Sequence, residues 1–200
     1  HMWIQEGFAV YSEALYIEHK LGYNVMIDFL LKKRQGIKNN LPIVGPVNEN
    51  YWAFGDSYNK GAWVLHTLRN AINNDDLWFS TLKKFAVDNA KSHVSTETFL
   101  NYIIRATGKN YQLVFYQYFY DHRPPTFEYH QQGQKFYYRW SNVISGFAMP
   151  VDIDLNGVEK RLEVSEKLSS INISEHSVIH IRDWESLIIT KRNPDLKKLN

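Results

Sequence analysis

The sequence contains no cysteine, and this absence excludes disulfide bonds and thiolate metal sites. Any metal ion bound by these side chains would need His, Asp or Glu as ligands. An excess of one charge is also lacking, because 23 Lys and Arg residues against 21 Asp and Glu residues give a net charge of +2. So small an excess does not indicate a nucleic-acid partner or a membrane surface.

Long apolar runs are lacking as well. No stretch approaches the roughly 20 residues that a membrane-spanning helix needs, and no signal peptide is visible. The second absence excludes nothing, because His1-Met2 resembles the remnant of a cloning tag and Trp3 begins in the middle of a helical pattern. We therefore expect the native amino terminus to lie upstream of Trp3, and localisation stays open.

Aromatic side chains, in contrast, are plentiful: Phe, Trp and Tyr make up 15% of the 200 residues. A chain of this length can bury the core of one large domain or of two modest ones. Aromatic residues in this number indicate core and interface packing, with a sugar-binding platform as the alternative.

Hydrophobic periodicity predicts a helical part followed by a strand part, and so an α+β fold. Up to about Arg123 the apolar residues recur at helical spacing, and Pro124-Pro125 ends the helical part because proline lacks the amide hydrogen. The pattern predicts helices over 3–21, 24–33, 56–73, 75–89, 95–107 and 110–120, with Asn24, Asp56 or Ser57, and Ser95 among the caps and a long ordered loop over 37–56.

From Thr126 onward the period changes to two, which is typical of strands. Strands are predicted over 126–129, 135–140, 151–155, 161–164, 177–181 and 186–190, with Asn156-Gly157 as a hairpin turn. Several short strands at this spacing indicate a small antiparallel β-sandwich. The predicted organisation is a helical portion over 1–124, a β-sandwich over 125–192 and a frayed tail over 193–200.

Two glutamates are notable on the first predicted helix. Glu6 lies beside Gly7 and Ala9, whose small side chains let another element approach closely. Glu13 lies two helical turns further on, so the two carboxylates share one face with Val10 between them. Buried carboxylates must be paired, hydrogen-bonded or metal-bound. The pattern leaves open a solvated or salt-bridged pair and a metal or acid–base site.

Tyr58 falls in the first turn of the helix predicted from Asp56 or Ser57. Free backbone amides and the helix dipole favour negative charge there, so a phenol in this turn could donate a hydrogen bond to a developing oxyanion. The alternative is that Tyr58 only packs on Trp63.

The histidines form no recognisable metal motif. They are scattered, no His-Glu-x-x-His helix is present, and His66, inside an apolar helix face, is interpreted as a core histidine. Neither a glycine-rich phosphate loop nor a serine in a Gly-x-Ser-x-Gly context occurs.

Taken together, two segments resemble motifs of the aminopeptidase N-like zinc metallopeptidases. Residues 3–9, Trp-Ile-Gln-Glu-Gly-Phe-Ala, are similar to the Trp-x-x-Glu-Gly-Phe-Ala motif of that family, and residues 58–62, Tyr-Asn-Lys-Gly-Ala, to its Tyr-x-Lys-Gly-Ala segment. Their order and the long loop between them fit the family. A looser likeness continues through the aromatic helix that precedes Pro124 and through the β-sandwich, so the resemblance covers most of the chain.

The resemblance implies the carboxyl-terminal part of a thermolysin-like catalytic domain that removes amino-terminal residues from peptides. Glu6 would be the third zinc ligand, Tyr58 would stabilise the tetrahedral intermediate, and Glu13 would at most support the ligand from behind. The chain departs from the family by lacking the His-Glu-x-x-His helix, which provides two ligands and the general base. One carboxylate cannot hold zinc tightly where three protein ligands are usual. We therefore expect an inactive fragment of an active enzyme, with zinc absent or weakly bound.

Two other functions stay open: a catalytically dead scaffold or binding protein of the same fold, and a helical module joined to a carbohydrate-binding sandwich with Trp140 in a sugar platform. We also expect the missing upstream domains to cover the Glu6 face. Without them, Trp3 and Phe8 would be exposed, and this face could drive self-association.

Overall fold

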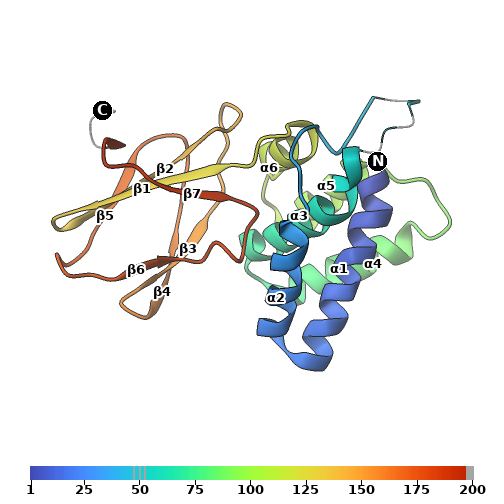
Figure 1. Cartoon of the computed structure of the whole chain (residues 1–200). Coiled ribbons are helices and arrows are strands. Elements are labelled where there is room, and N and C mark those ends of the chain that lie inside the picture. Colours follow the sequence, from blue (N-terminus) through green and yellow to red (C-terminus); the bar gives the residue numbers. More distant parts are fainter. Residues whose placement is uncertain (47, 50, 52, 197–200) are drawn as a thin grey trace. The chain divides into compact units, whose positions relative to one another are not determined.

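In a computed structural model the chain forms two compact units, His1–His122 and Arg123–Asn200 (Figure 1). The structure describes all residues except 47, 50, 52 and 197–200. Helices make up the first unit and strands the second, so the predicted α+β class is confirmed. In the part that the structure describes, no helix combines the length and the apolar character needed to cross a membrane.

The first unit begins with two long helices, α1 (Met2–Leu21) and α2 (Tyr23–Arg34), which lie side by side. Gly22 separates them at a φ of 95°, a backbone conformation that favours glycine. A long loop and the short 3-10 turn η1 (Ala53–Gly55) lead to α3 (Asp56–Ile72), which packs along α1. The helices α4 (Asp75–Asp88) and α5 (Thr96–Thr107) follow and lie side by side.

Several predicted helix ends are confirmed and others are wrong. Ser95 caps α5 in a reciprocal capping box with Thr98. The predicted cap at Asn24 is wrong, because α2 starts one residue earlier and its N-cap is Gly22. The predicted cap at Asp56 or Ser57 is also wrong: the N-cap of α3 is Gly55, and the Asp56 carboxylate binds the preceding loop instead.

The last predicted helix is not one continuous α-helix. A single turn, α6 (Gln112–Phe115), passes into the π-helical turn η2 (Tyr116–Tyr120). The amide of Asp121 donates to the carbonyl of Tyr116 at 3.1 Å, which closes the wider turn. The Phe119 carbonyl accepts a bond of 3.1 Å from the amide of Val44, so this turn also anchors the long loop.

The second unit contains two small sheets. One has the strand order β5-β2-β1-β7, formed by Ser169–Asn172, Lys135–Ser141, Thr126–Gln132 and Ile189–Arg192. The other has the order β4-β3-β6, formed by Val158–Leu162, Val151–Leu155 and Ile179–Ile181. Among the strands that the structure describes, β1 and β7 pair in parallel and the other pairs are antiparallel. Strands of both sheets contribute buried side chains, among them Phe127 and Trp140 in the first sheet and Ile153 in the second.

Trp140 lies in the core of this second unit, with 1% of its surface exposed. Its ring packs edge to face against Phe147, and its Nε1 donates to the carbonyl of Met149 at 2.9 Å. A sugar platform needs an exposed ring face, so the interpretation of Trp140 as part of such a platform is wrong.

An aromatic cluster forms the core of the helical unit around Trp3. This indole stacks on Phe119 at a centroid distance of 4.1 Å, and its Nε1 donates to the hydroxyl of Thr96 on α5 at 2.9 Å. Trp3 has 0% of its surface exposed and Phe8 is half-buried. The expectation that Trp3 is exposed is therefore wrong: residues of this same chain cover it.

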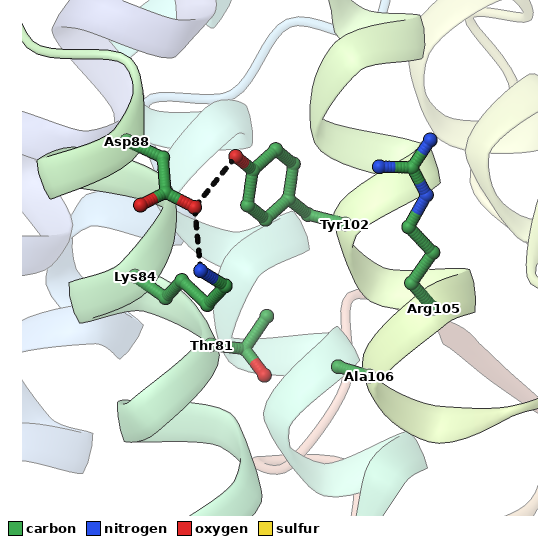
Figure 2. Close-up of a pocket in the computed structure, with 6 residues that line it drawn as sticks. All are labelled: Thr81, Lys84, Asp88, Tyr102, Arg105 and Ala106. Carbon is green, nitrogen blue, oxygen red and sulfur yellow. Dashed lines mark hydrogen bonds and ion pairs between the residues drawn. The ribbon is translucent and has the colours of Figure 1, made fainter.

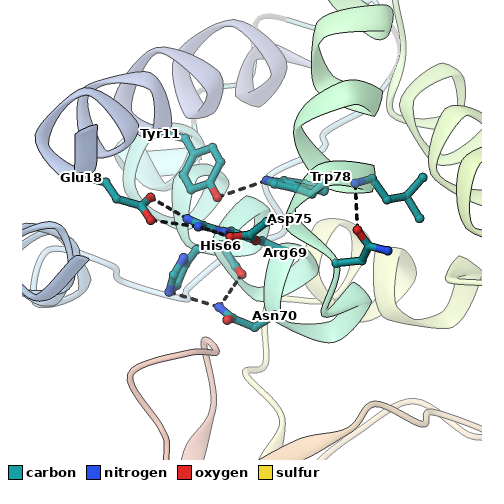
Figure 3. Close-up of polar contacts among 9 residues, drawn as sticks. Tyr11, Glu18, His66, Arg69, Asn70, Asp75 and Trp78 are labelled. Atoms are coloured by element: carbon teal, nitrogen blue, oxygen red, sulfur yellow. Dashed lines mark hydrogen bonds and ion pairs between the residues drawn. The ribbon is translucent and has the colours of Figure 1, made fainter. Parts of the chain in front are cut away.

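A buried arginine joins three helices near the other end of α1 (Figure 3). The guanidinium of Arg69, on α3, donates to both carboxylate oxygens of Glu18 on α1, at 2.6 and 2.9 Å, and to both of Asp75 at the start of α4, at 2.7 and 2.8 Å. Burial lowers the pKa of Arg69, but the hydrogen bonds that Arg69 donates to both carboxylates outweigh this effect and keep the side chain charged. His66 lies beside this cluster with no exposed surface, which confirms its interpretation as a core histidine.

Candidate active site

The structure brings Glu6 and Tyr58 together. Glu6 lies on α1 and Tyr58 in the first turn of α3, and the Glu6 carboxylate is close enough to the Tyr58 hydroxyl to raise its pKa. Both residues are half-buried. Two side chains that are 52 positions apart in the sequence, and that the sequence singled out separately, thus form one polar pair.

A pair of glycines explains why the two helices come so close. A Cβ atom built on Gly7 would lie 2.9 Å from both the Cα and the carbonyl carbon of Gly61, and one built on Gly61 would lie 2.9 Å from the Cα of Gly7. Side-chain carbons are not found at such distances from backbone atoms, so only glycine fits at both positions. Glu6 directly precedes Gly7, and Tyr58 lies one helical turn before Gly61. The glycine contact therefore sets the distance between the carboxylate and the phenol.

Electrostatics keep the Tyr58 hydroxyl protonated. Partial burial raises the pKa of Tyr58, and the negative charge of Glu6 and the hydrogen bond to it raise this pKa further. A phenol with a raised pKa is neutral at physiological pH and acts as a hydrogen-bond donor. Trp63 is fully buried and donates its Nε1 hydrogen to the Leu30 carbonyl at 2.8 Å. The alternative that Tyr58 packs on Trp63 concerns the phenol ring and stays a prediction.

Glu13 does not join this pair. Its side chain is 60% exposed, and its carboxylate lies 3.9 Å from the Nζ of Lys33 on α2. This is a surface ion pair, and such pairs contribute little to stability. Glu13 therefore fits the alternative of a salt-bridged carboxylate. Glu6, in contrast, lies next to Tyr58, the other candidate site residue.

The described residues do not make up a complete set of ligands for a metal ion. Within the described residues, no group of three or more His, Asp or Glu side chains lies in an arrangement that could hold a metal ion. A catalytic zinc site normally uses three protein ligands. Glu6 could be one of them, but these residues alone do not fit a complete zinc site.

Two hollows lie elsewhere on the helical unit. One, of about 370 Å³, lies between α4 and α5, where Lys84 and the hydroxyl of Tyr102 both bind one oxygen of Asp88, at 2.7 and 3.0 Å (Figure 2). The other, of about 400 Å³, lies between α1 and α4 and is lined mainly by apolar side chains. Neither is lined by Glu6 or Tyr58.

Sequence reasoning expected a close approach at Gly7 but missed the residues that complete it. The partner Gly61 and the buried side chains of Asp56 and Lys60 appear only once α1 and α3 are packed. A signal was present, since the segments Glu-Gly-Phe-Ala and Lys-Gly-Ala each place a glycine inside a predicted helix. Glycine in a helix interior is unfavourable unless a close approach requires it.

A comparison with known protein families matches the helical unit. The sequence model described as "Peptidase family M1 domain" matches residues 1–118, which is more than half of the chain. The chain therefore belongs to peptidase family M1, and the predicted aminopeptidase N-like membership is confirmed at the level of the family.

A solved structure shows the same fold. Over 96% of this chain, the structure titled "Crystal structure of Legionella pneumophila aminopeptidase A in complex with aspartic acid" superposes with a TM-score of 0.72 at 17% sequence identity. The match covers 24% of the Legionella chain, so this chain spans about a quarter of that length. At this identity the likeness concerns the fold. A search of curated protein sequences finds no match.

Proposed function

We propose that the chain is the carboxyl-terminal part of the catalytic domain of a zinc-dependent aminopeptidase, followed by a small β-sandwich. Residues 1–124 would complete the catalytic domain, and residues 125–192 would form the sandwich. The close contact of Gly7 with Gly61, which brings the Glu6 carboxylate near the Tyr58 hydroxyl, carries this proposal. Membership of peptidase family M1 and the fold of the Legionella aminopeptidase support it.

In this proposal Glu6 and Tyr58 have different roles. Glu6 supplies one carboxylate ligand to a zinc site whose other ligands come from outside these 200 residues. Tyr58 donates its hydroxyl hydrogen to the substrate's carbonyl oxygen as negative charge develops there, and its raised pKa keeps that hydrogen in place. The substrate would be a peptide with a free amino terminus. The chain by itself would not hydrolyse peptides, because a single carboxylate does not make a zinc site.

The test uses the longest native gene product that contains these residues. Release of single amino acids from a panel of aminoacyl fluorophores is measured for the wild type and for Tyr58→Phe and Glu6→Gln. We expect Tyr58→Phe to lower kcat by about 100-fold to 1,000-fold, as is typical for loss of an oxyanion donor. Glu6→Gln should abolish activity and lower the bound zinc measured by elemental analysis.

Two matched variants control for the loss of a hydroxyl or a charge elsewhere. Tyr16→Phe changes an exposed tyrosine on α1, and Asp28→Asn changes an exposed carboxylate on α2. Both should retain wild-type activity. Full activity in Tyr58→Phe would refute the proposed role. A folded wild type without activity on any substrate would favour a catalytically dead scaffold.

A further inference from the structure

Lys60 is a lysine whose side chain is fully buried in the helical unit. It lies on α3 between Tyr58 and Gly61, and 0% of its surface is exposed. An ammonium group that is buried without partners is strongly unfavourable. The contacts of Lys60 should therefore explain why a charged side chain occupies this position.

The Nζ atom of Lys60 binds the end of the helical unit. It donates to the carbonyl oxygens of Asp121 at 3.4 Å and of His122 at 3.2 Å. Both carbonyls directly follow η2, and the carboxyl end of a helical turn carries partial negative charge that attracts a cation. Lys60 thus ties α3 to a segment about 60 positions further along the sequence.

Asp56 binds a third segment one helical turn before Lys60. Its two carboxylate oxygens each accept a 2.8 Å hydrogen bond, from the backbone amides of Lys38 and Asn39. Burial lowers the pKa of Lys60 to about 8, and the negative charges of Asp56 and Asp121 act in the opposite direction. The ammonium form therefore predominates at neutral pH.

Tyr58 lies between these two anchored residues in the first turn of α3. The contacts of Asp56 and Lys60 fix this turn from one side, and the contact of Gly61 with Gly7 fixes it against α1. We propose that Lys60 is a positioning residue of the candidate site: its ammonium group fastens the first turn of α3 to the carbonyls of Asp121 and His122, and this holds the Tyr58 hydroxyl against Glu6. The catalytic meaning of this arrangement rests on the proposed function, whereas the positioning itself does not.

A double-mutant cycle on the 200-residue chain tests the positioning without any assay of activity. The unfolding equilibrium constant is measured in urea for the wild type, Glu6→Ala, Tyr58→Phe and the double variant, and the non-additivity reports the coupling of the two side chains. We expect a coupling of about threefold to tenfold in the wild type. In the Lys60→Met background this coupling should fall below about 1.5-fold, which is about one-half to one-seventh of the coupling expected in the wild type.

The background Ile103→Ala is the control for general loss of stability. Ile103 is fully buried on α5 and belongs neither to the anchored turn nor to the glycine contact, so its truncation should leave the coupling intact. Unchanged coupling in Lys60→Met would overturn the proposal, and so would an equal loss in Ile103→Ala. If Lys60→Met does not fold, Lys60→Gln replaces it under the same criteria.

The second measurement concerns the longer peptidase. Lys60→Met should lower kcat by about tenfold to 100-fold, because small displacements of a catalytic group have effects of this size, while KM changes less than twofold. A wild type without activity would refute the proposed function and leave the result of the cycle valid. An active enzyme whose kcat is unchanged by Lys60→Met would overturn the positioning role in catalysis.

Discussion

Substituting Gly7 with alanine tests whether the close crossing of α1 and α3 stabilises the fold as we infer. The change has two opposite effects on the free energy of unfolding. Alanine is the better helix former, which should stabilise α1 by about 1 kcal/mol. Against this, the new Cβ would lie 2.9 Å from two backbone atoms of Gly61 and 3.3 Å from the backbone nitrogen of Ala62.

The destabilisation by the clash should exceed the stabilisation by the better helix former. Overpacking a core costs about 1–3 kcal/mol, and the upper part of this range applies when the obstacle cannot rotate away. Here the obstacle is the backbone of α3, so α1 and α3 must move apart. We expect a net loss of about 2 kcal/mol, which corresponds to a fall in Tm of about 4–8 °C for a chain of this size.

Urea denaturation followed by circular dichroism measures this loss, and Ala9→Gly provides the matched control. Ala9 is exposed on α1, so Ala9→Gly reports the intrinsic difference between alanine and glycine in the same helix, about 1 kcal/mol of destabilisation. Equal or greater stability of Gly7→Ala than of the wild type would refute the reasoning, because the helix preference would then act without a clash.

Two further predictions concern buried charges. Arg69→Ala should lower the free energy of unfolding by about 3–5 kcal/mol in urea denaturation, because it leaves Glu18 and Asp75 without their cation. As a control, Arg105→Ala, which removes an exposed arginine, should change this free energy by less than about 0.5 kcal/mol. Similar effects of the two substitutions would contradict the inferred role of Arg69. In the second unit, burial raises the pKa of Glu185 from 4.5 to about 7 although Arg182 opposes the shift. The folded state therefore binds the proton more tightly than the unfolded state, so stability falls as the pH rises from about 4.5 to about 7, by about 3 kcal/mol at most. Glu185→Gln should flatten this dependence in thermal unfolding across pH, and an unchanged slope would count against it.

The sequence predicted the regular elements better than their ends. Strand β5 was missed because Ser169–Asn172 has one apolar residue and no alternation of apolar with polar side chains. The last strand was predicted over 186–190 but spans Ile189–Arg192, because Leu187 and Ile188 are core residues that precede the strand. Apolar patterns report burial, and burial extends beyond the hydrogen-bonded ladder.

The candidate site was likewise predicted only in part. Glu6 and Tyr58 could be named from their motifs, and the first turn of α3 was located within one residue. The proximity of these two side chains could not be predicted from periodicity, because it depends on how closely α1 and α3 cross. The exposed position predicted for Trp3 failed for a related reason: its partners, Thr96 and Phe119, come from segments more than 90 positions away.

Most positions of the two motifs have a packing role in this structure. Trp3 fills the aromatic core, Gly7 and Gly61 let the helices touch, and Lys60 anchors α3 to the end of the unit. Glu6 and Tyr58 are half-buried, and the charge of Glu6 raises the pKa of the Tyr58 hydroxyl. The geometry of the pair is thus fixed by contacts within this chain. A donor whose position is fixed before the substrate binds is the arrangement that electrostatic catalysis requires, because only the hydroxyl hydrogen of Tyr58 then has to turn from Glu6 toward the oxygen on which charge develops.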